Sequence, residues 1–386
     1  LIEQAQAPLE RAAGTFSTAA SELDALETAN VIADVRDAVI ELQGAVHTAA
    51  GATASARDAA DLLPSLLGAD GPRTILLMFQ NNAELRTGGG ITGSFTQFDA
   101  QDGALSLVDQ ASSSDFTRLA APILPTPAAD AALFGDDVGT FVQNITMTTD
   151  FDFSAELANA WWQQHTGVTP DVVVAIDPLV IRSVVAAAGG VPLPDGTVLT
   201  ADDFIDTLLV EPYRTLDQDQ QTLLQEAVTA ATFDFVLRGG ISPLEWIGAL
   251  TGPVQDGRVS LWTADPDAEA LVADTVLGGP RARHAATPGD AFAVWLNDAG
   301  GGKMAPFLET AVEPRVEVCR ADGKSDVTIS VTLTSTAPAD AASLPTSVTG
   351  GGYYGVAPGD ISLNLSVAAP EGFLAAGVTD GAERLL

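Results

Sequence analysis

The sequence is poor in the residues that build covalent cross-links and metal sites. Its 386 residues include one cysteine, Cys319, and three histidines, His47, His165 and His284, none at metal-ligand spacing from another. A single cysteine excludes an internal disulfide, and scattered histidines argue against a zinc site. No apolar run reaches the roughly 18–20 residues that a membrane span needs. Because the chain begins at Leu1 rather than Met, we expect any signal peptide or anchor to lie outside it.

Basic residues are scarce as well. Lysine occurs only at Lys303 and Lys324, and 17 basic residues face 51 acidic ones, which gives a formal net charge of −34. Such a field repels nucleic-acid phosphates and anionic lipid surfaces, so nucleic acid is excluded as a partner. What the chain does have is a hydrophobic content of 46%. Together with the length, this predicts two or three folded domains.

The composition and the spacing of apolar residues change twice along the chain. Residues 1–70 are rich in alanine and carry apolar residues at three-to-five-residue steps, which predicts a helical stalk or hairpin. Residues 71–312 alternate strand-like and helix-like segments, which predicts an α/β core domain. Residues 313–386 contain short alternating strands between Pro-, Gly- and Ser-rich turns, which predicts a β-sandwich-like domain. This last domain ends abruptly, so we expect it to be truncated.

Within the core, individual elements can be predicted. Asp171–Ile176 is a short apolar run that predicts a central strand. A helix is expected over Leu179–Ala188, because Gly189-Gly190 stops it. Another is expected over Ser154–His165, with Ser154 as its N-cap.

The densest concentration of polar groups follows an apolar strand that begins at Ile75. The turn after this strand carries five polar side chains, Gln80, Asn81, Asn82, Glu84 and Arg86, and then the glycines Gly88, Gly89 and Gly90. Polar side chains at the end of a buried strand are costly unless they bind something or tie down a loop. Glycines leave backbone N–H groups uncovered, as close approach by a ligand or by another backbone requires.

These glycines do not predict a dinucleotide site. Gly88, Gly90 and Gly93 satisfy G-x-G-x-x-G, but that motif needs a helix after the glycines. Here alternating apolar residues on either side of Asp102-Gly103 predict a β-hairpin instead.

Each polar side chain of the turn has two interpretations. Arg86 and Glu84 could hold a phosphate and a metal ion, or they could pair with each other, and we favour the pairing. Asn81 and Asn82 could donate to a sugar or pyrophosphate, or they could satisfy the strand end and turn carbonyls. The residues alone do not decide between binding and architecture here.

Four segments together resemble an uncharacterised envelope family common in actinobacteria, domain of unknown function four thousand and twelve. They are Leu62–Gly68, Gln80–Gly89, Val173–Pro178 and Leu296–Met304. The resemblance implies a single-pass membrane protein with its bulk outside the cell. At Gly90 this sequence departs from the family, which is expected to have an aromatic residue there.

A fainter resemblance extends to the LytR–CpsA–Psr family. It rests on the order of a strand, Asp177, a helix, Gly189-Gly190-Val191, a further helix, Tyr213-Arg214 and a glutamine-rich helix start. Members of that family transfer polyprenyl-pyrophosphate-linked glycopolymers to the cell wall, using arginines, an aspartate and magnesium. The resemblance implies roles for Arg86, Asp177, Arg214 and Gln221. Asp217 and Asp219 stand where that family has arginines, and acids there would repel a pyrophosphate.

The sequence therefore predicts an α/β protein with an N-terminal helical stalk, a core distantly like the LytR–CpsA–Psr fold and a C-terminal β domain. The leading hypothesis is an extracytoplasmic cell-envelope protein that binds a glycan or a polyprenyl-phosphate-linked precursor; the sequence leaves open whether it also acts as an enzyme. The alternatives are a magnesium-dependent glycopolymer phosphotransferase and a structural assembly or adhesion module. The membrane would be a partner only through an anchor absent from this chain.

The candidate site residues fall into three groups. Those expected to act in catalysis are Arg86, Asp177 and Arg214. Those expected to bind ligand are Asn81, Asn82, Glu84, Arg86, Gly88, Gly89 and Gln221. Those expected to hold Mg²⁺ are Glu84 and Asp177.

Overall fold

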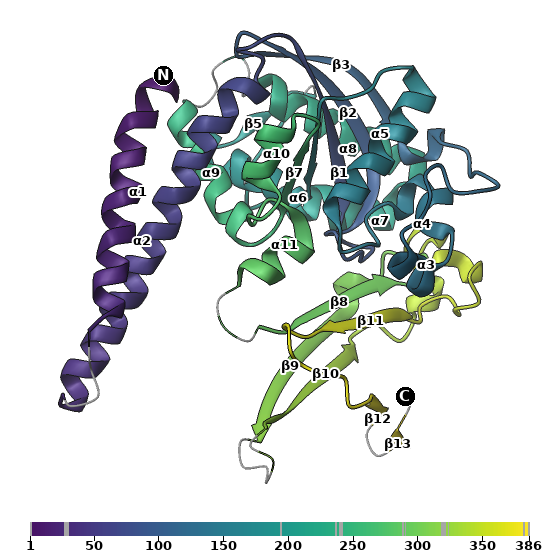
Figure 1. The fold of residues 1–386 in the computed structure, drawn as a ribbon. Coiled ribbons are helices and arrows are strands. Elements are labelled where there is room, and N and C mark those ends of the chain that lie inside the picture. The colour runs from purple at the N-terminus through teal and green to yellow at the C-terminus, as the bar shows by residue number, and fades with distance from the viewer. Residues whose placement is uncertain are drawn as a thin grey trace.

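The protein consists of a helical hairpin, a mixed sheet with helices on both faces, and a β-rich C-terminal part (Figure 1). This arrangement is seen in a computed structural model. The structure describes residues 2–26, 31–193, 195–235, 238, 242–287, 289, 291–317, 322, 324–380 and 383–384. The mixed α/β class predicted from the sequence is confirmed.

The central sheet has five strands in the order β3-β2-β1-β4-β7. Their bounds are β1 Arg73–Asn81, β2 Ile91–Gln101, β3 Ala104–Ser112, β4 Val172–Ile176 and β7 Val259–Thr263. Strands β1 and β4 are parallel, and the other neighbours are antiparallel. The carboxyl ends of β1 and β4 therefore lie at the same edge as the amino ends of β2 and β7.

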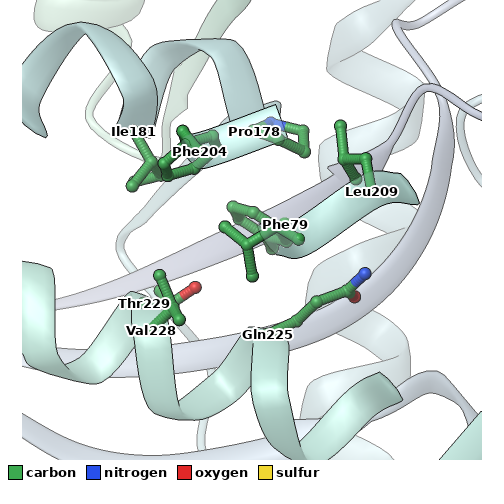
Figure 2. Close-up of a pocket in the computed structure, with 9 residues that line it drawn as sticks. Phe79, Pro178, Ile181, Phe204, Leu209, Gln225, Val228 and Thr229 are labelled. Atoms are coloured by element: carbon green, nitrogen blue, oxygen red, sulfur yellow. The ribbon is translucent and has the colours of Figure 1, made fainter. Parts of the chain in front are cut away.

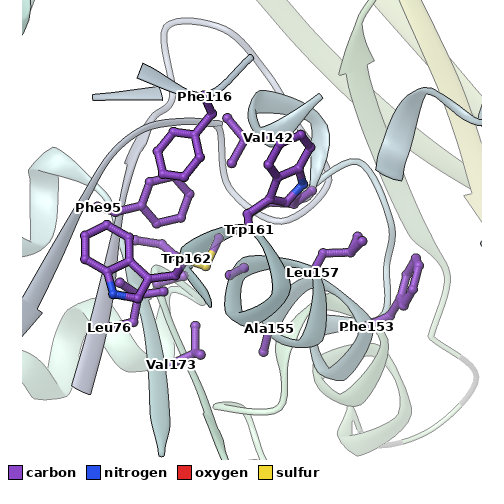
Figure 3. Packing of buried hydrophobic residues seen from close by; sticks show 14 of the residues in the cluster. Leu76, Phe95, Phe116, Val142, Phe153, Ala155, Leu157, Trp161, Trp162 and Val173 are labelled. Carbon is purple, nitrogen blue, oxygen red and sulfur yellow. The ribbon is translucent and has the colours of Figure 1, made fainter. Parts of the chain in front are cut away.

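Helices cover both faces of this sheet because its central strands are apolar on both sides. On one face α5, Phe151–Thr166, buries Leu157, Trp161 and Trp162 against Phe95 of β2 (Figure 3). The other face is covered by α6, Pro178–Ala188, and α8, Gln218–Phe235. The remaining helices around the sheet are α9 Pro243–Gln255, α10 Pro266–Val272 and α11 Gly279–Ala286.

Short elements complete the core. They are α3 Ala128–Phe134, α4 Asp137–Thr140, β5 Val191–Pro192, β6 Val198–Leu199, a π-helical turn Asp206–Val210 and α7 Glu211–Thr215. Single turns of 3₁₀ helix occur at Ser113–Asp115, Val142–Asn144, Ala305–Phe307, Ala341–Ser343 and Gly350–Gly352, and α12 is Thr346–Thr349.

The N-terminal segment forms the predicted helical hairpin. Helix α1, Ile2–Asp24, runs beside α2, Ala33–Leu66 (Figure 1). Near the core end of the hairpin, Gln6 Nε2 donates to the carbonyl of Ala60 at 3.0 Å. The last turns of α2 bury Leu62 and Leu66 in a cluster with strand β4 and helix α10, and this packing attaches the hairpin to the sheet. Among the described helices, none is both long and apolar enough to cross a membrane.

The C-terminal part is built from two-stranded ribbons. Strand β8, Ala293–Asp298, pairs with β11, Leu363–Ala368, and β9, Leu308–Glu317, pairs with β10, Asp326–Ser335. A short hairpin of β12, Thr379–Asp380, and β13, Glu383–Arg384, follows. In the described residues these ribbons stay separate instead of forming one sandwich. Cys319 lies outside the described residues.

The boundary expected between residues 312 and 313 falls inside β9, which is one continuous strand. The structural change comes earlier, at β8, because β8 pairs with β11 from the end of the chain instead of joining the central sheet. An alternating apolar pattern does not reveal which partner a strand takes.

Candidate functional site

Polar side chains meet at the sheet edge where β1 and β4 end. Asp177 directly follows β4 and caps α6, because its Oδ1 accepts from the N–H groups of Leu179 at 2.9 Å and Val180 at 3.2 Å. Its other oxygen accepts from Asn82 Nδ2 at 3.1 Å and from Arg258 Nη1 at 2.6 Å. All four donors point at one buried carboxylate. Asp177 is therefore held as an N-cap and ion-pair partner.

Arg258 is the residue of this cluster that sequence reasoning did not select. It lies just before β7 and 81 residues from Asp177, so no local motif connects them. The Asp177 side chain is 4% exposed, whereas the Arg258 side chain is 33% exposed. The cluster thus presents a cation at the surface, backed by a buried carboxylate.

The glycines after β1 are in close contact with other residues of the same chain. Gln80 Nε2 donates to the carbonyl of Gly88 at 2.8 Å, and the Gly88 N–H donates to the Thr146 carbonyl at 2.8 Å. Gly89 has φ +121°, which favours glycine, and a Cβ there would collide with Gln80 Oε1. A Cβ on Gly90 would lie 2.6 Å from the backbone of Asn81. Backbone packing therefore accounts for the glycines at positions 89 and 90.

Glu84 and Arg86 form a buried ion pair. Arg86 Nη2 lies 2.8 Å from Glu84 Oε1 and donates also to Asn144 Oδ1 at 3.2 Å. Arg86 Nη1 donates to the backbone carbonyls of Leu85 at 2.9 Å and Asp298 at 3.3 Å. Burial raises the pKa of Glu84, and the adjacent Arg86 opposes that rise. The favoured interpretation, that these two residues pair with each other, is confirmed.

The two most polar segments of the family resemblance contact each other. Asn297 Oδ1 accepts from the Thr87 N–H at 2.9 Å, and its Nδ2 donates back to Thr87 Oγ1 at 3.0 Å. The Asp298 N–H donates to the carbonyl of Leu85 at 2.8 Å. The loop after β1 is thus cross-linked to the last residues of β8, more than 200 residues away.

Lys303 extends this contact towards α7 and α8. Its Nζ donates to Gln221 Oε1 at 3.2 Å and lies 4.6 Å from the centre of the Tyr213 ring. Asn81 Nδ2 donates to the Tyr213 hydroxyl. Burial lowers the pKa of Lys303, and Glu84 opposes this shift. We call the whole set the polar junction: Asn81, Glu84, Arg86, Tyr213, Gln221, Asp298 and Lys303.

The predicted site residues therefore separate into two groups. Asn81, Glu84, Arg86 and Gln221 belong to the polar junction, whereas Asn82 and Asp177 belong to the cluster with Arg258. The side chain of Arg214 lies outside what the structure describes, although its backbone is part of α7. Tyr213, Lys303 and Asp298 were not selected as site residues because only the folded chain brings them together.

An apolar crevice begins beside Asp177. It lies between β1, α6, α8 and the π-helical turn, and Figure 2 shows α6 and α8 side chains on opposite sides of Phe79. The empty space totals about 230 Å³, part of it open to solvent, and it is too narrow for a water-sized sphere. Its lining residues are Phe79, Pro178, Ile181, Phe204, Leu208, Leu209, Gln225, Val228 and Thr229.

The acids expected to hold Mg²⁺ are already engaged. Asp177 accepts four hydrogen bonds, and Glu84 is buried against Arg86. In the described part of the chain, no three acidic, histidine or cysteine side chains are grouped so that they could hold a metal ion. Glu84 and Asp177 do not fit a shared Mg²⁺ in this arrangement, and magnesium stays a prediction.

A family model matches part of the chain. Residues 70–213 match the model of a family described as a protein of unknown function, DUF4012. The predicted resemblance to that family is confirmed over this segment. The match spans β1 to α7 and so includes the loop after β1, Asp177 and most of the crevice lining. No curated protein matches the chain.

Several solved structures are similar to the chain at low identity. Lin1025 from Listeria innocua is 12% identical with a TM-score of 0.31, covering 67% of this chain and 90% of its own. B. subtilis TagU is 13% identical with a TM-score of 0.31, covering 51% of this chain and 79% of its own. B. subtilis TagV is 14% identical with a TM-score of 0.31, covering 57% of this chain and 87% of its own.

Proposed function

We propose that this is an extracytoplasmic cell-envelope protein that binds a polyprenyl-phosphate-linked glycan precursor without turnover. One observation carries the proposal: the apolar crevice and the residue that holds the partly exposed Arg258 are adjacent in the chain. Pro178 lines the crevice, and Asp177 before it holds Arg258 at the surface. An apolar chain with an anionic head group is the ligand class that such a juxtaposition would accept.

The crevice must open before a chain can enter. Leu208 and Leu209 come from the π-helical turn Asp206–Val210, and they form part of its wall. π-helical turns are rare in proteins, and those that occur are frequently found at functional sites. Movement of this turn would widen the crevice while the sheet and α6 stay in place. The head group would then lie beside Arg258 and Asn82.

Native mass spectrometry with a polyprenyl phosphate tests this proposal directly. The wild-type protein should retain the lipid phosphate, and Arg258→Gln should bind it at least about tenfold more weakly, since one charge-assisted contact is lost. Arg238→Gln is the matched control, because Arg238 is 79% exposed and pairs with Asp234 on α8. Lack of lipid binding by the wild type, with and without magnesium, would overturn the proposal.

Binding is favoured over turnover by the state of the candidate catalytic residues. Arg86 is fixed by Glu84 and three further acceptors, and Asp177 is fixed by four donors. The phosphotransferase alternative would require these residues to leave their partners. Transfer of a lipid-linked glycan by the wild type, abolished in Asp177→Asn, would support that alternative.

One observation favours the assembly alternative. On the β9–β10 ribbon, Val312 pairs opposite Val331 and Val316 opposite Val327, so these four share one face. Val312 is 45% exposed and Val316 is 55% exposed. A partner-binding module would use such a face. The variant Val316→Ser tests this alternative. If it still binds lipid but no longer self-associates or binds a partner, the two roles belong to separate surfaces.

A further inference from the structure

Arg283 is a largely buried cation without an acidic partner. It lies on α11, and its Nη1 donates to Ser260 Oγ at 3.4 Å and to the carbonyl of Val276 at 3.3 Å. Both bonds are long. Among the residues that the structure describes, no carboxylate lies within ion-pair distance of it.

Four other arginines around the central sheet differ. Arg73, Arg86, Arg258 and Arg281 each have a carboxylate partner, at 3.9, 2.8, 2.6 and 3.0 Å respectively. A chain with 51 acidic residues has ample means to neutralise one more guanidinium. Burial alone lowers the pKa of Arg283, to about 10, and no acidic neighbour contributes to that shift. A buried charge that lacks a counter-charge is costly, so its retention needs a reason.

The backbone makes room for this guanidinium. Gly257 has φ +72°, and a Cβ there would lie 2.7 Å from Arg283 Nε. Within the described chain, Arg283 Nε and Nη2 make no hydrogen bond, so two parallel donors are available. Ser260 Oγ lies beside Nη1 and supplies a further donor. The neighbouring Arg258 is already paired with Asp177 at 2.6 Å and with Asp256 at 3.8 Å, so the charge of this site comes from Arg283.

We propose that Arg283 and Ser260 form a binding site for a phosphate-type oxyanion. The guanidinium fork matches two oxygens of a phosphoryl group, and the Ser260 hydroxyl beside it can donate to a third. The site lies on the α11 side of β7, and its argument does not use the apolar crevice. The phosphoryl group can come from free phosphate or from the head group of a lipid-linked ligand.

Thermal unfolding in phosphate and in chloride of equal ionic strength tests the site. Phosphate should raise the Tm of the wild-type protein, and this rise should vanish in Arg283→Met. In chloride, Arg283→Met should be at least as stable as the wild type, because an unpaired buried cation is replaced by an apolar side chain. Arg281→Met is the control on the same helix: Arg281 is 62% exposed and paired with Asp150, so this variant should keep the phosphate effect.

Titration with inorganic phosphate and with geranyl phosphate distinguishes the two sources. At least tenfold weaker binding of either compound by Arg283→Met supports the site. Tighter binding of geranyl phosphate assigns it to a lipid-linked ligand, and equal binding assigns it to free phosphate. Unchanged phosphate binding by Arg283→Met, with a lower Tm in chloride, would mean that Arg283 is structural. That result would leave the Arg258 test of the proposed function unaffected.

Discussion

At the residue scale, the buried pair of Glu84 and Arg86 allows a sharp stability prediction. Arg86→Met should reduce the free energy of unfolding by about 3–5 kcal/mol, because it leaves a buried carboxylate without its partner. Adding Glu84→Gln should recover much of this loss, since the uncompensated charge is then gone. Urea unfolding of both variants and the wild type measures the effect. Equal losses in the single and double variants would show that the charge of Glu84 is not the cause.

The raised pKa of a second residue, Glu269 on α10, predicts that the stability of the fold depends on pH. Burial and the neighbouring Asp152 raise its pKa from 4.5 to about 7, although the Thr263 N–H opposes this. The folded state then binds more protons than the unfolded state, so this group lowers stability as the pH rises from about 4.5 to about 7. In Glu269→Gln this decline should be smaller. Thermal unfolding from pH 4 to pH 8 provides the measurement.

The control for Glu269 is Glu245 on α9, whose shift has the opposite sign. Hydrogen bonds from Ser242 lower the pKa of Glu245, so its contribution is present above 4.5 and is lost as the pH falls below it. Glu245→Gln should therefore alter the pH dependence of stability only on the acid side of the profile, and its effect between pH 4.5 and pH 8 should be constant. Parallel profiles for Glu269→Gln and the wild type between pH 4.5 and pH 7 would contradict the assignment.

At the scale of elements, the turn between β1 and β2 has no room for a side chain at Gly90, because backbone atoms of Asn81 lie against it. Gly90→Ala should cost about 1–3 kcal/mol, because its Cβ has no room beside the Asn81 backbone. Gly93→Ala is the matched control: the nearest atom to its Cβ would be Phe79 O at 3.7 Å, an ordinary contact. Chemical denaturation of both variants tests the difference. Similar small losses in both would mean that the turn can shift.

Many elements could be predicted because their signals are local. The strand at Asp171–Ile176 and the helix at Leu179–Ala188 were expected within a residue or two of their observed ends. The helix expected at Ser154–His165 exists, but its N-cap was wrong: it begins at Phe151, and Asp150 occupies the N-cap position. Apolar spacing marks the body of a helix better than its first turn, where several polar residues can serve as the cap.

The site could be predicted only in part, because its partners are far apart in sequence. Asn82 is conspicuous as a polar residue at the end of an apolar strand, and Asp177 is implied by the resemblance to the LytR–CpsA–Psr family. Arg258 was not predicted, since only the pairing of β4 with β7 places it beside Asp177. The loop after β1 was correctly marked as unusual. Its contact with Asn297 could not be derived from either segment alone.

At the scale of the whole molecule, the net charge of −34 predicts a salt response. Raising sodium chloride from about 10 mM to about 200 mM shortens the Debye length from roughly 30 Å to below 10 Å and so reduces self-repulsion in the folded state. The Tm should therefore rise, as scanning calorimetry would show. If screening is the cause, tetramethylammonium chloride at equal ionic strength should raise the Tm by the same amount. A rise with sodium alone would point instead to specific cation binding.

The hydrogen bonds between the loop after β1 and the end of β8 also set an order of events during synthesis. The backbone carbonyl that Arg86 contacts belongs to Asp298, 212 residues later. At ~5–20 residues per second, roughly 10–40 s pass before the ribosome supplies that partner. During this interval Arg86 can already pair with Glu84, but it lacks the Asp298 carbonyl as an acceptor. The contact between the loop after β1 and the end of β8 therefore forms late. By then the core has already begun to fold, and the C-terminal part packs against it last.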